Sequence, residues 1–259
     1  MGKIPGETQQ LLTIDGCQLR IRTVGSGPAE FVLVHGIGVS ARYFGPLAAE
    51  LARHGTVHRV DLPGHGGTAK PERALGLVDY ARVVNGAMEG LGIGPAVLVG
   101  HSMGCQVVVE LALHYPDAAT ALVLLAPTAN SRERTAWQHS VRLFQDSLRE
   151  PLIVDLIEFT DYARCGPRWY LKTLPAMLGQ KLEHRIAGVQ VPVRVVHGVK
   201  DPIVPLDWCR ELVEACPDAT LDSIAGEAHV MMFRSPEPVA RLCLAPAAPG
   251  GDAAAGDRP

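Results

Sequence analysis

Gly100-His101-Ser102-Met103-Gly104 is the stretch that decides the fold of this chain. It follows an apolar run at residues 96–99 and precedes a helix-like segment at residues 105–112. A serine in this context predicts a sharp turn from strand to helix, with a strained backbone and an outward-pointing hydroxyl. Gly100 and Gly104 are expected where neighbouring chain passes too close for a Cβ atom. We therefore interpret Ser102 as a candidate nucleophile.

The bulk composition is that of an ordinary globular protein. The chain has 259 residues, of which 47% are hydrophobic and 20% charged, enough for one large domain carrying an insertion. A formal net charge of −3 argues against nucleic acid or an anionic membrane as partner. Residues 1–7 hold no apolar core of a signal peptide, and no apolar run reaches the length of a membrane span. We expect a cytoplasmic protein.

The cysteines are scattered along the chain and form no Cys-x-x-Cys pair. A domain of this size does not need disulfides for stability, so we expect free thiols in a reducing compartment. They are Cys17, Cys105, Cys165, Cys209, Cys216 and Cys243.

Strand and helix patterns alternate along most of the chain. Residues 11–14 and 19–24, separated by Asp15-Gly16, predict an opening hairpin. Apolar runs separated by helices then indicate a mainly parallel α/β sheet covered on both faces. The further strands are expected at residues 31–34, 57–60, 96–99, 121–125, 193–196 and 220–224, and helices at residues 41–53, 78–91, 105–112 and 205–216.

The alternation stops at residues 127–188, which we interpret as a helical cap inserted after the sixth strand, between residues 1–126 and 189–244 of the core. This segment carries the aromatic anchors Trp137, Phe144 and Trp169, which are candidate pocket residues. Ordinary packing helices would give the same periodicity. Helix breaks are expected at Pro151, Gly166-Pro167 and Pro175, and residues 245–259 have the composition of a disordered tail.

A serine hydroxyl needs a neighbouring base to take its proton. His101 adjoins Ser102, but strand alternation turns its side chain away. His229 follows the last predicted strand and is the candidate base. Asp201, after the strand at residues 193–196, is the candidate that orients it. Weaker acid candidates are Asp207, inside the next helix, and Glu227, which is too near His229 in sequence.

A developing oxyanion needs two backbone N–H donors. The residue after the nucleophile, Met103, supplies one. The loop after the strand at residues 31–34 is expected to supply the other from Ile37, within His35-Gly36-Ile37-Gly38.

These motifs together resemble the α/β-hydrolase superfamily, in its lidded serine hydrolase and acyltransferase type. The chain order Ser102, Asp201, His229 is the order of that superfamily. The resemblance covers nearly the whole chain apart from the cap and the tail. It implies an eight-stranded, mostly parallel sheet with the triad at its carboxyl edge and no cofactor. It also implies supporting roles, not proton transfer, for His35 and for His65 of the loop at residues 61–66.

Two other kinds of site are disfavoured by the sequence. Gly36-Ile37-Gly38-Val39-Ser40-Ala41, with Asp61 further on, fits a dinucleotide-binding motif. That interpretation leaves Ser102, Asp201 and His229 unexplained. His54 and His58 have helical spacing, but the residues between them end a helix, so no metal site is expected.

The predicted chemistry is an acyl-serine intermediate formed from an ester or thioester of a small, mainly apolar acyl group. Water as acceptor gives an esterase or thioesterase, whereas another acceptor gives an acyltransferase of natural-product biosynthesis. The resemblance permits an acyl carrier protein as donor without requiring it. A haloperoxidase-like reaction would use the same triad, and a non-catalytic binder is a minor alternative. The sequence leaves the acyl group, the acceptor and the oligomeric state open.

Overall fold

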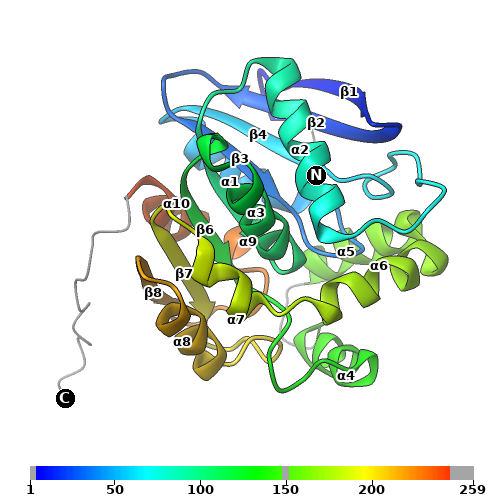
Figure 1. Ribbon diagram of the computed structural model, residues 1–259, viewed down its shortest axis with the longest axis vertical. Helices are drawn as coiled ribbons and strands as arrows, with labels where there is room; N and C mark the ends of the chain where they lie inside the picture. The colour runs from blue at the N-terminus through cyan, green and yellow to red at the C-terminus, as the bar shows by residue number, and fades with distance from the viewer. Residues whose placement is uncertain (1–3, 148–151, 246–259) are drawn as a thin grey trace.

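The computed structural model describes residues 4–147 and 152–245. An eight-stranded sheet, in the order β1-β2-β4-β3-β5-β6-β7-β8, crosses the molecule (Figure 1). The antiparallel pairs are β1–β2 and β2–β4, and the remaining pairs are parallel. The strands are β1 (Thr8–Ile14), β2 (Cys17–Gly25), β3 (Glu30–Val34), β4 (Thr56–Asp61), β5 (Ala96–His101), β6 (Ala119–Leu125), β7 (Val193–Gly198) and β8 (Ala219–Ile224).

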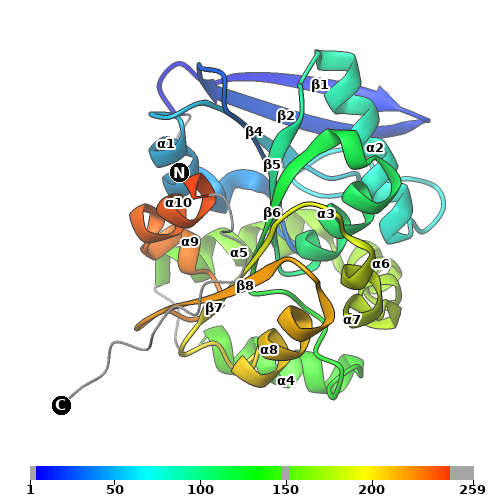
Figure 2. The same cartoon turned by 60° about the vertical axis from the view of Figure 1, so that its left-hand side comes forward.

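Helices cover both faces of this sheet. Figure 2 shows α1 and α10 on one side of the central strands and α2 and α3 on the other. The core helices are η1 (Ala41–Phe44), α1 (Gly45–Leu51), α2 (Leu77–Leu91), α3 (Met103–His114), η2 (Pro116–Ala118), α8 (Leu206–Ala215), α9 (Met231–Arg234) and α10 (Pro236–Leu244). Between β6 and β7 lie α4 (Ala136–Ser147), α5 (Leu152–Cys165), α6 (Pro167–Gly179), α7 (Leu182–Arg185) and η3 (Ile186–Gly188).

The central strands are apolar because both of their faces are covered. Val32, Leu33 and Val34 of β3 are all fully buried, although alternate side chains point to opposite faces. The helix after the sharp turn, α3, is buried along almost its whole length between β5, β6 and α2. This rigid centre fixes the start of α3 and therefore the position of Ser102.

The predicted sheet and opening hairpin are confirmed, while two predictions about helices were wrong. The helix expected at residues 41–53 is divided into η1 and α1, with Pro46 in the first turn of α1. Pro175 lies inside α6 and does not break it. Because Leu174 and Met177 on either side of this proline are buried, packing holds the helix despite the lost backbone hydrogen bond.

Other expectations about helix ends and cysteines have mixed outcomes. The break at Gly166-Pro167 is confirmed, since α5 ends at Cys165 and α6 begins at Pro167. Pro151 and residues 246–259 of the expected tail lie outside the described residues. All six cysteines are free, as the sequence predicted, and the structure buries each of them.

Candidate active site

Ser102 lies on the sharp turn between β5 and α3. Its φ and ψ angles are 55° and −121°, in a region that non-glycine residues rarely adopt. Its backbone N–H donates to the carbonyl of Leu125 in the adjacent strand β6 (3.0 Å). A Cβ on Gly100 would lie 2.5 Å from the carbonyl oxygen of Gly104, and one on Gly104 would collide with Val34. The predicted need for glycine at these two positions is confirmed.

His229 and Asp201 meet at the same edge of the sheet. His229 follows β8 and Asp201 follows β7, and Nδ1 of His229 lies 2.7 Å from Oδ2 of Asp201. The other carboxylate oxygen accepts the backbone N–H groups of Ile203 (2.7 Å) and Val204 (3.1 Å). These donors hold the carboxylate in place. The carboxylate accepts the proton of Nδ1, so Nε2 is the nitrogen whose lone pair can take up another.

The weaker acid candidates have other partners. Asp207 has a side chain that is 67% exposed and pairs with Arg210 on the same helix. Glu227 accepts a hydrogen bond from the hydroxyl of Ser235 (2.9 Å) and lies 3.4 Å from Arg234. The contact with Nδ1 of His229 described above is therefore made by Asp201, at 2.7 Å.

His101 joins the turn to the segment that carries His229. Its Nε2 lies 3.0 Å from the backbone oxygen of His229, and the two ring centroids are 4.7 Å apart. Ser102 and His229 therefore belong to one buried cluster at the carboxyl edge, with 6% and 5% exposure respectively.

Thr128 was not singled out in the sequence, yet its hydroxyl lies 3.4 Å from Oγ of Ser102. It follows β6, and 1% of it is exposed. Its position after a strand that pairs with β5 is the signal that could have indicated it, because parallel strands end at a common edge. Tyr43, which contacts His101, carries no such signal.

The loop after β3 passes directly against Ser102. A Cβ on Gly36 would lie 3.0 Å from Cβ of Ser102, so a side chain here would force the loop or the turn to shift by a few tenths of an ångström. Ile37 is 4% exposed, and Gly38 has a φ of +80°. Nε2 of His35 accepts the N–H of Leu62 (3.0 Å), which leaves Nδ1 to donate to the carbonyl of Gly36 (2.7 Å).

Burial keeps His35 neutral and lowers its pKa to about 4. Its neighbour His65, with ring centroids 5.2 Å apart, has a pKa lowered to about 3 by the same cause. Neither imidazole is therefore charged near neutral pH. Their hydrogen bonds to backbone groups fit structural support of the two loops.

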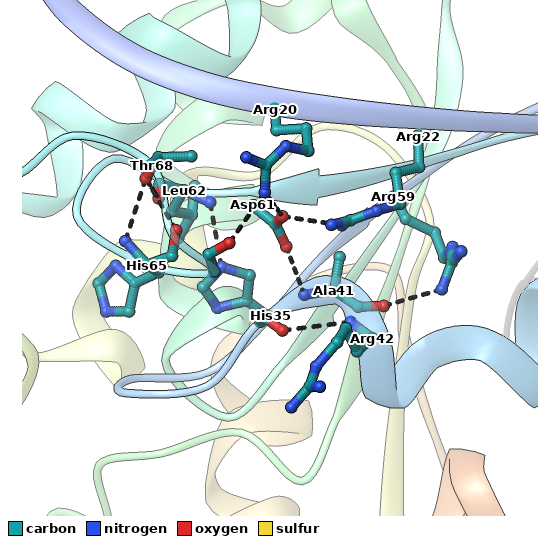
Figure 3. A network of polar contacts seen from close by, with 12 residues as sticks. Arg20, Arg22, His35, Ala41, Arg42, Arg59, Asp61, Leu62, His65 and Thr68 are labelled. Atoms are coloured by element: carbon teal, nitrogen blue, oxygen red, sulfur yellow. Dashed lines mark hydrogen bonds and ion pairs between the residues drawn. The ribbon is translucent and has the colours of Figure 1, made fainter. Parts of the chain in front are cut away.

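Figure 3 shows the contacts that fix the segment following this loop. The buried carboxylate of Asp61 accepts the N–H of Ala41 (2.8 Å), which belongs to the start of η1. Arg20 (3.1 Å) and Arg22 (2.7 Å) of β2 compensate the charge of that carboxylate. Asp61 thereby joins β2, β4 and the segment that continues the loop after β3.

The aromatic residues expected in the pocket have different surroundings. Trp169 is 2% exposed and its indole leaves no room for a side chain at Gly64. Trp137 is 77% exposed, so the structure does not bring it to the site as a buried anchor. The side chain of Phe144 lies outside the described residues. Two tyrosines of the same segment, Tyr162 and Tyr170, have rings against Gly38.

The described part of the chain holds neither a group of metal ligands nor a membrane-spanning helix. No group of three or more His, Cys, Asp or Glu residues there could hold a metal ion. His58 bonds Thr23 (2.9 Å) and Glu30 (2.8 Å), away from the Ser102 edge. Among the helices of residues 4–147 and 152–245, none is long and apolar enough to span a bilayer.

The fold and this edge of the sheet define the class of protein. The sequence profile of the alpha/beta hydrolase family matches residues 31–242, and the chain belongs to that family. Several of its relatives are named as esterases or hydrolases, and the chain is an enzyme of the alpha/beta hydrolase type.

The pimeloyl-[acyl-carrier protein] methyl ester esterase of Chromobacterium violaceum is 29% identical over 236 residues, covering 82% of this chain and 91% of the relative. The 2-hydroxy-6-oxononadienedioate/2-hydroxy-6-oxononatrienedioate hydrolase of Burkholderia vietnamiensis is 27% identical, with 89% and 91% covered. Among solved structures, the enol-lactonase of Burkholderia xenovorans superimposes with a TM-score of 0.78 at 22% identity, covering 91% of this chain and 98% of that one. This structural likeness supports the fold.

Proposed function

We propose that the protein hydrolyses an ester or thioester of a small, mainly apolar acyl group through an acyl-serine intermediate. Ser102 is the nucleophile, His229 the general base and Asp201 the residue that orients it. The observation that carries the proposal is the 2.7 Å hydrogen bond between His229 and Asp201, formed beside the strained turn of Ser102. It sets the tautomer in which Nε2 accepts a proton.

The proposed reaction has two halves. His229 removes the hydroxyl proton of Ser102 as Oγ of Ser102 attacks the carbonyl carbon of the substrate. The N–H groups of Ile37 and Met103 stabilise the resulting oxyanion. The leaving alcohol or thiol takes the proton from His229. Water, deprotonated by His229, then attacks the acyl carbon, the bond to Oγ of Ser102 breaks, and His229 returns the proton to Oγ as the acid leaves. These steps need no cofactor.

The helices at residues 127–188 are proposed to form a cap that shapes the acyl pocket. Support comes from Tyr162 and Tyr170, whose rings lie against Gly38, and from Trp169, whose ring lies against Gly64. Aromatic surface next to the oxyanion loop suits an apolar acyl group and limits water. The esterase of Chromobacterium violaceum is named for an acyl-carrier-protein ester, which supports including carrier-linked esters among the substrates to be tested.

The experiment is time-resolved intact mass spectrometry of the protein mixed with acyl oxygen esters and thioesters of graded chain length. We expect a transient adduct on Ser102 that clears as free acid accumulates. Ser102→Ala is expected to lower turnover by about 10⁶-fold. Ser223→Ala, at an exposed position of β8, is the control and should leave turnover unchanged.

Each alternative gives a different result in the same experiment. A persistent acyl adduct would indicate a transferase whose acceptor is not water. Undiminished turnover by Ser102→Ala would exclude the proposed nucleophile. A failure of every ester and thioester to form an adduct would favour the ligand-binding alternative.

A further inference from the structure

Three segments that the proposed reaction uses are joined by one short series of hydrogen bonds. The backbone N–H of Gly36, in the loop after β3, lies 2.9 Å from the hydroxyl oxygen of Tyr43 in η1. That hydroxyl lies 2.7 Å from Nδ1 of His101 at the end of β5. Nε2 of His101 lies 3.0 Å from the backbone oxygen of His229.

The direction of every hydrogen bond in this series is fixed from both ends. The carbonyl of His229 can only accept, so Nε2 of His101 carries a proton and Nδ1 of the neutral ring accepts. The hydroxyl of Tyr43 must then donate to Nδ1, which leaves its oxygen to accept. At the other end, the N–H of Gly36 can only donate, so the hydroxyl oxygen of Tyr43 must be its acceptor. Each ring nitrogen of His101 thus makes one hydrogen bond, and the hydroxyl of Tyr43 makes two, one as donor and one as acceptor.

Packing holds the two rings in this arrangement. Tyr43 is 1% exposed and His101 is 2% exposed. Phe44 stacks on Tyr43 with centroids 4.7 Å apart and meets His101 edge-on at 6.4 Å. Burial also lowers the pKa of His101 well below its usual range and raises that of Tyr43, so both stay neutral.

We propose that Tyr43 and His101 are positioning residues that hold the oxyanion loop and the base segment in register with Ser102. The inference rests on the proposed function, because the groups that the two residues position are those of the proposed reaction. Neither residue is assigned a contact with the substrate. Misplacing a catalytic group by about 1 Å can cost about 10²-fold in rate. The neutral state of His101 also avoids repulsion between like charges. Its ring lies 4.7 Å from that of His229, which becomes an imidazolium during the proposed reaction.

The test compares Tyr43→Phe, His101→Ala, His101→Gln and His101→Asn with two matched controls. Gln places an N–H donor near the position of Nε2, and Asn places an acceptor near that of Nδ1, so each keeps one hydrogen bond of His101. Tyr80→Phe removes another buried tyrosine hydroxyl, 3.5 Å from Thr173. His58→Gln replaces another buried histidine that has partners on both ring nitrogens.

The readout is kcat/KM for p-nitrophenyl butyrate per active site, counted by titration with a fluorophosphonate. A merely structural role would lower the number of titratable sites but leave kcat/KM per site unchanged. We expect losses of about 10²-fold for His101→Ala and about tenfold for Tyr43→Phe, His101→Gln and His101→Asn. The controls should stay within about twofold, because surface and core changes away from the site leave its geometry intact.

A double variant, Tyr43→Phe with His101→Gln, tests whether the two residues act as one unit. The combined loss should be smaller than the product of the single losses, because each change already breaks the series.

Wild-type kcat/KM per titrated site in Tyr43→Phe and His101→Ala would overturn the proposal. If Ser102→Ala nevertheless loses turnover, the proposed function stands. If wild-type protein does not hydrolyse this ester, the same comparison uses the rate constant of fluorophosphonate labelling. Wild-type protein that reacts with neither probe would contradict both proposals.

Discussion

The hydroxyl of Ser40 donates a hydrogen bond to Oδ2 of Asp161 at 2.5 Å, across 121 positions of the sequence. Ser40 ends the loop after β3, and Asp161 lies on α5. The other carboxylate oxygen of Asp161 lies 2.7 Å from Nη2 of Arg42 in η1. Helix α5 is therefore attached by a fully buried carboxylate to the same segment that carries Gly36 and Ile37.

Arg42 adds two further contacts from that Nη2, to the carbonyl of Ile157 (3.1 Å) and the hydroxyl of Thr160 (2.6 Å). One side chain thus contacts three residues within about one turn of α5. A change in the position of this helix would therefore be transmitted to the loop after β3 through polar contacts as well as through the rings of Tyr162 and Tyr170.

Asp161→Asn is expected to weaken this attachment. The substitution leaves the guanidinium of Arg42 without its charge partner, and breaking a buried pair costs about 3–5 kcal/mol. Since a quarter of the Arg42 side chain is exposed, we expect a loss of about 2 kcal/mol in the free energy of unfolding. Urea unfolding measures it, with Asp207→Asn as the surface control. Equal stability of the two variants would contradict the role given to Asp161.

Asp201→Asn tests the choice among the three acid candidates of the sequence. An amide at this position can present its NH₂ group to Nδ1 of His229 and so favour the wrong tautomer. We expect kcat to fall by about 10⁴-fold, while the fold is kept because the second oxygen still accepts from Ile203 and Val204. Steady-state kinetics with Asp207→Asn and Glu227→Gln alongside decide the matter. A comparable loss in either of these would move the assignment away from Asp201.

Much of the sheet could be predicted from the sequence because most strands of the parallel region, such as β3, β5, β6 and β7, contain short apolar runs with turn signals at their ends. The candidate site followed for a related reason, since Ser102 and Asp201 stand soon after such runs and His229 follows the last predicted strand. What the sequence could not indicate are contacts between segments far apart. Tyr43 looks like any core aromatic residue, and Asp161 like any helix carboxylate, until the fold brings them to His101 and Ser40.

Pro175 and Trp137 illustrate the same limit in the opposite direction. A proline usually ends a helix, but the burial of Leu174 and Met177 outweighs the lost hydrogen bond in α6. Trp137 has the residue type of a buried anchor and is nevertheless exposed. Residue type predicts these roles only on average, because tertiary packing decides them.

His35 is expected to make stability depend on pH. Its pKa is about 4 when folded and about 6.5 when unfolded. At pH values above 6.5 both states are neutral at this residue. As the pH falls from 6.5 to 4, the unfolded state binds the proton that the folded state refuses, so the free energy of unfolding drops by up to about 1.4 kcal/mol per pH unit.

His35→Gln removes this titration and keeps an acceptor near the N–H of Leu62. Urea unfolding at several pH values should therefore give a shallower decline between pH 6.5 and 4 than in the wild type. His184→Gln, at a position with a 70% exposed side chain, is the control and should keep the wild-type slope. An unchanged slope in His35→Gln would show that other groups produce the decline.

Gly38→Ala, compared with Gly16→Ala, isolates the contact between the helices after β6 and the loop after β3. Both glycines have a left-handed φ, +80° and +75°, so both substitutions carry a backbone cost of about 1–2 kcal/mol. A Cβ at residue 16 meets nothing within 4 Å, whereas one at residue 38 would collide with the ring of Tyr162 and lie 3.0 Å from that of Tyr170. We expect Gly38→Ala to lose about 1–3 kcal/mol more stability than Gly16→Ala, as overpacking does elsewhere.

Activity should separate the two variants as well. Because Gly38 follows Ile37 directly, displacement of its neighbours is expected to lower kcat/KM for p-nitrophenyl butyrate about tenfold or more, while Gly16→Ala keeps the wild-type value. Adding Tyr162→Ala to Gly38→Ala removes the nearer ring from the collision and should recover part of the lost stability. If Gly38→Ala and Gly16→Ala lose the same stability and the second change recovers nothing, the ring of Tyr162 does not press on this loop in solution.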